Sequence, residues 1–127
     1  MKLERLDHIG IEVADLARAE RFYTEVLGLD LVAHLGNQTL LQCGDLNLAL
    51  FHVPREPLTF GERRDRISLP LGRGHHAFRV SPEDFAAAGE KLIEAGVECA
   101  KKINWGNHDC LYFLDPDGNL LEIVRYP

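Results

Sequence analysis

One carboxylate stands inside an apolar run near the end of the chain. Glu122 is flanked by leucine, isoleucine and valine in the run Leu120–Val124. Because an isolated buried carboxylate is very unstable, this side chain must face water, pair with a cation or bind a metal ion. A solvent-facing Glu on an edge strand is the ordinary interpretation of such a residue alone, so a functional role requires companions.

Two histidines at matching positions supply such companions. His8 and His75 lie 67 residues apart, and each opens a strand-like segment of the same character, residues 8–13 and residues 75–80. A single His near the start of a strand is usually structural. Two at equivalent positions of a repeat would instead be brought together by a pseudo-twofold axis.

The three side chains together suit a metal ion. Two imidazoles and one carboxylate form a facial set of ligands that leaves coordination positions open for water or substrate. We therefore expect one divalent metal ion held by His8, His75 and Glu122. Such a set favours Fe(II) or Mn(II), and Ni(II) or Zn(II) also remain possible.

The elements that must position these residues recur in the chain. Residues 6–13 predict a strand, Asp15 can cap a helix that runs to about residue 27, and Gly28 stands where a C-terminal cap belongs. In the second half, Ser81 begins a helix that ends near Gly96. Three further strands follow each helix, at residues 29–35, 38–43 and 46–53 and at residues 97–104, 108–114 and 119–125.

The pattern predicts one α+β domain over residues 1–127 with two βαβββ modules related by pseudo-twofold symmetry. The modules span about 1–53 and 75–127, and their sheets would curl around a metal-centred cavity, since each alone has too little core. Between them, residues 54–74 are rich in proline and glycine, so we expect no regular structure there. This segment is a linker or a lid.

Composition narrows the class of protein. The net charge of -6 argues against a nucleic-acid partner. The sequence shows no signal peptide and no apolar run of membrane-spanning length, so we expect no membrane partner. Cys43, Cys99 and Cys110 are odd in number and form no CxxC pair, which favours a reducing cytoplasm and small buried residues.

Three motifs resemble the vicinal oxygen chelate superfamily, which includes glyoxalases, bleomycin-resistance proteins and extradiol dioxygenases. They are residues 7–16 with Phe22-Tyr23 before Gly28, residues 75–80, and residues 112–119 followed by Leu121-Glu122. The resemblance covers nearly the whole chain. It implies the same metal ligands and a small oxygen-rich substrate chelated to the metal. It also implies a homodimer, and it leaves open whether the modules are exchanged between the chains.

Several chemistries occur in this superfamily. Extradiol ring cleavage is our main expectation, and the alternatives are a glyoxalase or lyase reaction and a fosfomycin-type thiol transfer. A metal-free drug-binding protein of the bleomycin-resistance kind is the alternative of another class. Aligning Asn47 with Asn119 matches Glu122 to Leu50, which cannot ligate, so no fourth protein ligand is expected.

Four more residues are candidates for the site. By resemblance, Tyr112 contacts the substrate and Lys102 matches a phosphonate-contacting lysine. Strand alternation places His108 on the face of Tyr112, where it is an acid or base, or else a satisfied polar residue at a loop edge. Trp105 is a stacking wall for a planar substrate, or else an aromatic packed on the rim.

Overall fold

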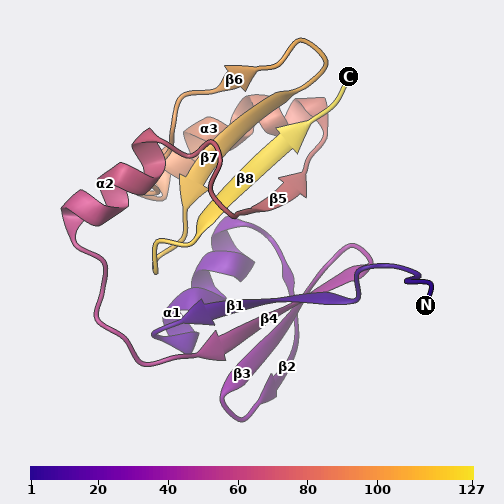
Figure 1. The fold of residues 1–127 in the computed structure, drawn as a ribbon, viewed down its shortest axis with the longest axis vertical. Helices are drawn as coiled ribbons and strands as arrows, with labels where there is room; N and C mark the ends of the chain where they lie inside the picture. Colours follow the sequence, from indigo (N-terminus) through magenta and orange to yellow (C-terminus); the bar gives the residue numbers. More distant parts are fainter. The chain divides into compact units, whose positions relative to one another are not determined.

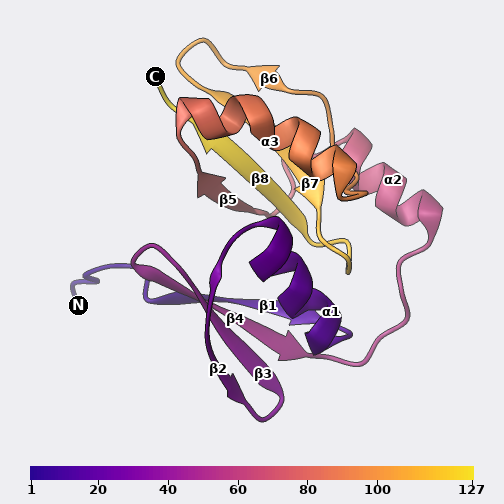
Figure 2. The same ribbon diagram turned by 180° about the vertical axis from the view of Figure 1, so that it is seen from behind.

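The structure, a computed structural model, describes all 127 residues. The chain divides into two compact units, Met1–Pro57 and Leu58–Pro127, and each is described by itself. Figures 1 and 2 show that each unit is built on its own sheet. None of the helices is long and apolar enough to span a bilayer.

The first unit is a four-stranded mixed sheet with one helix. Its elements are β1 (His8–Val13), α1 (Leu16–Arg21), the π-helical turn η1 (Phe22–Val26), β2 (Asp30–Leu35), β3 (Gln38–Cys43) and β4 (Leu46–His52). The strands lie in the order β1-β4-β3-β2. β1 runs parallel to β4, and the remaining pairs are antiparallel.

Local sequence explains the boundaries of the helix. The Asp15 carboxylate accepts a hydrogen bond from the backbone N–H of Arg18 at 3.0 Å, which caps the first turn. Gly28 has a φ of 77°, and this left-handed conformation lets the chain leave the helix without strain. Ala19 and Tyr23, both fully buried, supply part of the apolar face that packs on the sheet.

The second unit repeats this plan and adds a helix. Its elements are α2 (Phe60–Ser68), β5 (His76–Arg79), α3 (Pro82–Glu94), β6 (Ile103–Asn104), β7 (Asp109–Leu114) and β8 (Leu120–Arg125). The order β5-β8-β7-β6, with β5 parallel to β8, matches that of the first sheet. The expected α+β fold of two βαβββ modules is therefore confirmed at this level.

The two faces of the second sheet carry different residues. Alternation places Leu121 and Ile123 on the face that α3 covers, which Figure 2 shows from the helix side. Glu122 lies on the opposite face, opposite Tyr112 in the β7–β8 register. We call this second surface the open face of the second sheet.

The segment between the modules contains a helix, so the expectation of no regular structure over residues 54–74 is wrong. Residues 60–68 form α2, because Thr59 caps the helix by accepting from the backbone N–H of Glu62 at 3.1 Å. Ile67 of α2 packs against the cluster of Cys110, Tyr112, Leu114 and Leu120, so α2 lies on the open face. Gly61 lies in the first turn of this helix, and the prolines, Gly72 and Gly74 lie outside it.

The strand expected at residues 97–104 is also shorter in the structure. Cys99 forms a single bridge with Phe113, and regular pairing resumes only where Ile103 meets Cys110. Four residues on this segment thus span three on β7, and the extra residue interrupts the ladder.

Candidate functional site

His75 and Glu122 meet on the open face of the second sheet. The His75 Nε2 atom lies 2.9 Å from the Glu122 Oε2 atom. The Tyr112 ring packs edge-on against the His75 imidazole, with ring centroids 5.1 Å apart. The Glu122 residue is 7% exposed and Tyr112 is 5% exposed, while the His75 side chain is 27% exposed, so the carboxylate and the phenol are shielded and the imidazole is open to solvent.

The hydrogen bonds of His75 test whether this cluster fits a metal ion. Its Nδ1 lies 2.8 Å from the carbonyl oxygen of Arg73. Because a carbonyl only accepts, Nδ1 carries the proton, and in the neutral ring Nε2 then presents a lone pair. A lone pair and a carboxylate oxygen 2.9 Å apart repel each other unless a proton or a metal cation lies between them. The donor set therefore fits a cation.

His8 has a similar arrangement in the first unit. Its Nδ1 lies 2.8 Å from a carboxylate oxygen of Asp7, which leaves Nε2 as the free ligand atom. Such oxygen partners on the second ring nitrogen are typical of metal-binding histidines. The structure contains no group of three or more His, Cys, Asp or Glu side chains that could hold a metal ion. His8 belongs to the first unit, and His75 and Glu122 belong to the second.

The adjacent His76 is a competing candidate that the structure separates from His75. His76 pairs with Leu121, whose side chain lies on the α3 face, so its ring turns away from Glu122. Burial lowers the pKa of His76, and the neighbouring His75 lowers it further. Of the His75-His76 pair, only the first lies on the Glu122 side of the sheet.

Tyr112 keeps its proton in this environment. Burial raises the pKa of the Tyr112 phenol, and the Glu122 carboxylate beside it raises the pKa further. The hydroxyl is consequently a hydrogen-bond donor at neutral pH. Its place beside Glu122 lets it donate to an oxygen that binds near the carboxylate.

His108 and Trp105 belong to a stack of rings. The His108 ring lies between those of Trp105 and Tyr126, with centroids 6.3 Å and 5.1 Å away. The Arg79 guanidinium covers the Tyr126 ring at 4.9 Å from its centroid. The Trp105 Nε1 donates to the Cys110 Sγ at 3.3 Å. By strand alternation this stack lies on the open face, at the end of β8 beyond Glu122.

Lys102 lies elsewhere. Its ammonium is 5.2 Å from the centroid of the Phe85 ring, on α3. A Cβ at Gly89 of the same helix would lie 3.3 Å from the Lys102 Cε, so the stem runs along α3. The structure does not bring Lys102 together with Glu122 and His75.

The register of the first unit corrects the expected match to Glu122. Gly10 pairs with Ala49, and its repeat equivalent Ala77 pairs with Glu122. The matching residue is therefore Ala49 and not Leu50, which is fully buried. Ala49 has no ligand atom either, so we still expect no fourth protein ligand at the position that matches Glu122.

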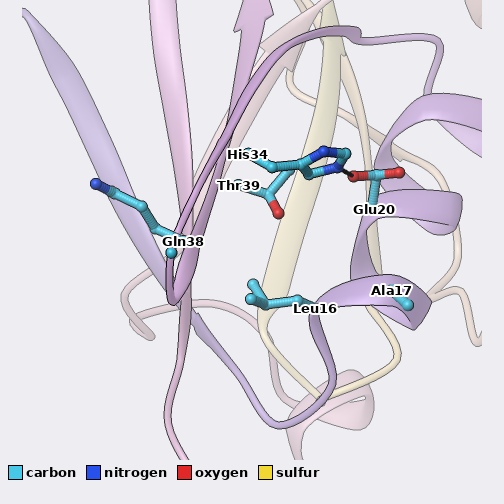
Figure 3. Close-up of a pocket in the computed structure, with 7 residues that line it drawn as sticks. Leu16, Ala17, Glu20, His34, Gln38 and Thr39 are labelled. Carbon is cyan, nitrogen blue, oxygen red and sulfur yellow. Dashed lines mark hydrogen bonds and ion pairs between the residues drawn. The ribbon is translucent and has the colours of Figure 1, made fainter.

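A separate hollow of the first unit lies away from His8. It measures about 300 Å³ and is lined by residues of α1, β2 and β3, among them Glu20 and His34, which form an ion pair (Figure 3). Thr39, another lining residue, pairs with Leu50 and so faces α1. His8 alternates onto the opposite face.

Cys43 also departs from the expectation of three buried cysteines. It is exposed, while Cys99 is half-buried and Cys110 is buried. Cys43 ends β3 at the Gly44-Asp45 turn, where nothing covers the strand. The sequence signal was available, since a residue beside a tight turn is usually accessible.

Sequence reasoning missed several residues of the open face. Tyr126 and Arg79 complete the ring stack, and Arg66 and Arg73 line a hollow beside Leu120. Arg79 carried a usable signal, because it lies four residues after His75 and alternates onto the same face. The arginines of α2 carried none, since their segment had no recognisable periodicity.

Comparison with known proteins gives the family. The model of the Glyoxalase/Bleomycin resistance protein/Dioxygenase superfamily matches residues 5–123. The chain belongs to this superfamily.

Three curated relatives illustrate its range. The glutathione transferase FosA of Serratia marcescens is 35% identical, covering 95% of this chain and 80% of the relative. The metallothiol transferase FosB of Lysinibacillus sphaericus is 28% identical, covering 96% and 82%. Metapyrocatechase 2 of Cupriavidus necator is 30% identical, but the match, 96% of this chain, covers only 33% of that protein.

Solved structures agree on the fold. The fosfomycin resistance protein FosX of Listeria monocytogenes superimposes with a TM-score of 0.78. The match covers 99% of this chain and 96% of that one, at 19% identity. At this identity the likeness concerns the fold alone.

Proposed function

We propose that this chain is a divalent-metal-dependent enzyme that adds a thiol to a small oxygen-rich substrate, with His8, His75 and Glu122 as the metal ligands. The observation that carries the proposal is the contact of the His75 Nε2 atom with the Glu122 carboxylate at 2.9 Å on the open face. When bound, the metal ion supplies Lewis acidity to a substrate oxygen. Fe(II) and Mn(II) remain the favoured ions for this donor set.

Thiol transfer replaces ring cleavage as the main expectation because of the relatives. The matches cover 80% and 82% of the two thiol transferases, whereas the match to the metapyrocatechase covers only 33% of that protein. A glyoxalase or lyase reaction uses the same ligands and is the second candidate. The metal-free drug-binding alternative is disfavoured by the chain's two matched histidines and the buried Glu122.

The chain's own residues would then divide the work. Tyr112, protonated beside Glu122, donates a hydrogen bond to a substrate oxygen. The stack of Trp105 and His108 bounds the open face and positions the substrate, and His108 exchanges a proton with it. Lys102 would have to leave Phe85 to reach a ligand, so we assign it no step.

Metal content tests the proposal. We expect about one Mn(II) or Fe(II) per chain by elemental analysis after mild purification, and sharply less in His75→Ala, His8→Ala and Glu122→Gln. Glu122→Gln keeps the size of the side chain and removes its charge. His52→Ala is the matched control, because His52 is exposed and alternates with Ala49 onto the other face of its strand.

The outcomes are distinct. Full metal content in Glu122→Gln with an unchanged far-ultraviolet spectrum would contradict the ligand assignment. With metal confirmed, turnover of fosfomycin with glutathione, measured beside catechol and glyoxalase substrates, assigns the reaction. A metal-free protein that only binds a cationic drug would establish the alternative class.

We also propose a homodimer. The proposed ligands are divided between the two units of the chain, and each sheet has edges that need cover. A monomeric mass by light scattering at tens of micromolar would contradict this.

A further inference from the structure

A polar hollow lies on the second unit next to the His75–Glu122 cluster. It measures about 360 Å³ and is lined by Arg66, Arg73, Gly74, Asn119 and Leu120. No carboxylate lines it, and two of its five lining residues carry a permanent positive charge.

The two arginines have N–H groups to spare. Arg66 donates from Nη1 to the carbonyl oxygen of Gly118 at 2.9 Å, and Arg73 donates from Nε to that of Leu69 at 2.9 Å. These bonds orient both guanidinium groups without neutralising them. A guanidinium has five N–H donors, so most of those on each arginine remain for a ligand.

Neither arginine is paired with an acid. No ion pair joins Arg66 or Arg73 to a carboxylate, in contrast to Arg63, whose guanidinium binds Glu98 at 2.7 Å. A second hollow of about 280 Å³ is lined by the same two arginines with Glu62 and Asp65. An anion would therefore enter the first hollow, where no carboxylate repels it.

The position of the hollow links it to the candidate metal site. Gly74 immediately precedes His75, and Leu120 lies two residues before Glu122 on the same face of β8. Two residues along a strand correspond to about 7 Å. One small molecule can therefore contact the arginines and the Glu122 cluster together.

We propose that Arg66 and Arg73 form an anion-binding subsite that holds a carboxylate, phosphonate or phosphate group of the substrate. The inference rests on the proposed function and adds that its substrate is an anion. Paired arginines suit this role because a planar guanidinium donates two parallel hydrogen bonds to an oxyanion. α2, which supplies Arg66, is fixed to the 115–118 turn through Arg63, so the subsite is formed before the ligand arrives.

Inorganic phosphate is the first probe. Calorimetric titration of the EDTA-treated protein with phosphate measures binding at the subsite in the absence of the metal. Titration with sodium chloride of equal ionic strength is the control. We expect saturable binding that Arg66→Gln and Arg73→Gln each weaken by about tenfold or more. Arg64→Gln is the matched control on the same helix, since Arg64 is exposed and makes no side-chain bond, and it should stay within about twofold.

Further titrations identify the preferred anion and distinguish failure of the anion subsite from failure of the metal site. Methylphosphonate and acetate, titrated in the same way, show which oxyanion is preferred. Glu122→Gln should bind phosphate like the wild type, so loss of the metal site and loss of the anion subsite are read independently. The proposal would be overturned if the wild-type protein bound no phosphate, or if Arg64→Gln and Arg73→Gln bound phosphate with equal affinity. Arg73 is exposed, so Arg73→Gln remains informative if Arg66→Gln does not fold.

Discussion

Arg63 provides a sharp test of how α2 is held on the open face. Its side chain is 17% exposed and donates to Glu98 through Nε and Nη2. It also donates to the carbonyl oxygens of Pro116 at 3.0 Å and Asp115 at 2.9 Å. Arg63→Ala would leave two carbonyls of the 115–118 turn and one carboxylate without this donor.

The expected loss of stability follows from these contacts. Each bond from the charged guanidinium to a carbonyl is worth about 1 kcal/mol net when water partly replaces it. The Glu98 side chain is 40% exposed, so its ion pair contributes only about 0.5–1 kcal/mol. Arg63→Ala should therefore lower the free energy of unfolding by about 3 kcal/mol, and Arg63→Lys by less, because lysine keeps the charge but not the planar fork.

Trp105 makes the measurement direct. It is the sole tryptophan and lies in the second unit, so its fluorescence during urea denaturation reports the unfolding of that unit. Arg64→Ala, at an exposed position of the same helix, should change stability by less than about 0.5 kcal/mol. If Arg63→Ala costs no more than Arg64→Ala, α2 is not anchored in this way, and the preformed anion subsite loses its support.

Three other expectations concern single positions. Tyr112→Phe should lower turnover, measured by steady-state kinetics, by roughly 10-fold to 1000-fold, and it should leave the metal content, measured by elemental analysis, unchanged. Unaltered kinetics would mean that the Tyr112 ring only packs against its neighbours. Gly118→Ala should cost about 2 kcal/mol in urea denaturation, because φ is +83° and a Cβ would collide with Leu58; a neutral effect would show that the turn relaxes freely. Iodoacetamide should label exposed Cys43 first, because burial raises the pKa of the Cys110 thiol and shields it, and mass spectrometry showing equal rates at pH 8 would contradict that environment.

The sequence by itself determined the repeated modules. Alternating and helical apolar spacing, the caps at Asp15 and Ser81 and the Asp115–Gly118 turn are local signals, and the structure has the corresponding elements. The spacing of His8 and His75 also came from sequence alone. Such features are readable because they depend on residues a few positions apart or on comparison of the two halves.

Only the tertiary structure decided which side chains meet. The contact of His75 with Glu122 depends on the pairing of β5 with β8, and a shift of one residue would turn Glu122 to the α3 face. Comparison of this pairing with that of β1 and β4 identifies Ala49, not Leu50, as the match to Glu122. α2 escaped detection because its segment shows no apolar periodicity, and none of its residues is buried. Arg63 alone gives no sign that it binds the carbonyls of a turn some 50 residues away, since that contact exists only once the sheet has formed.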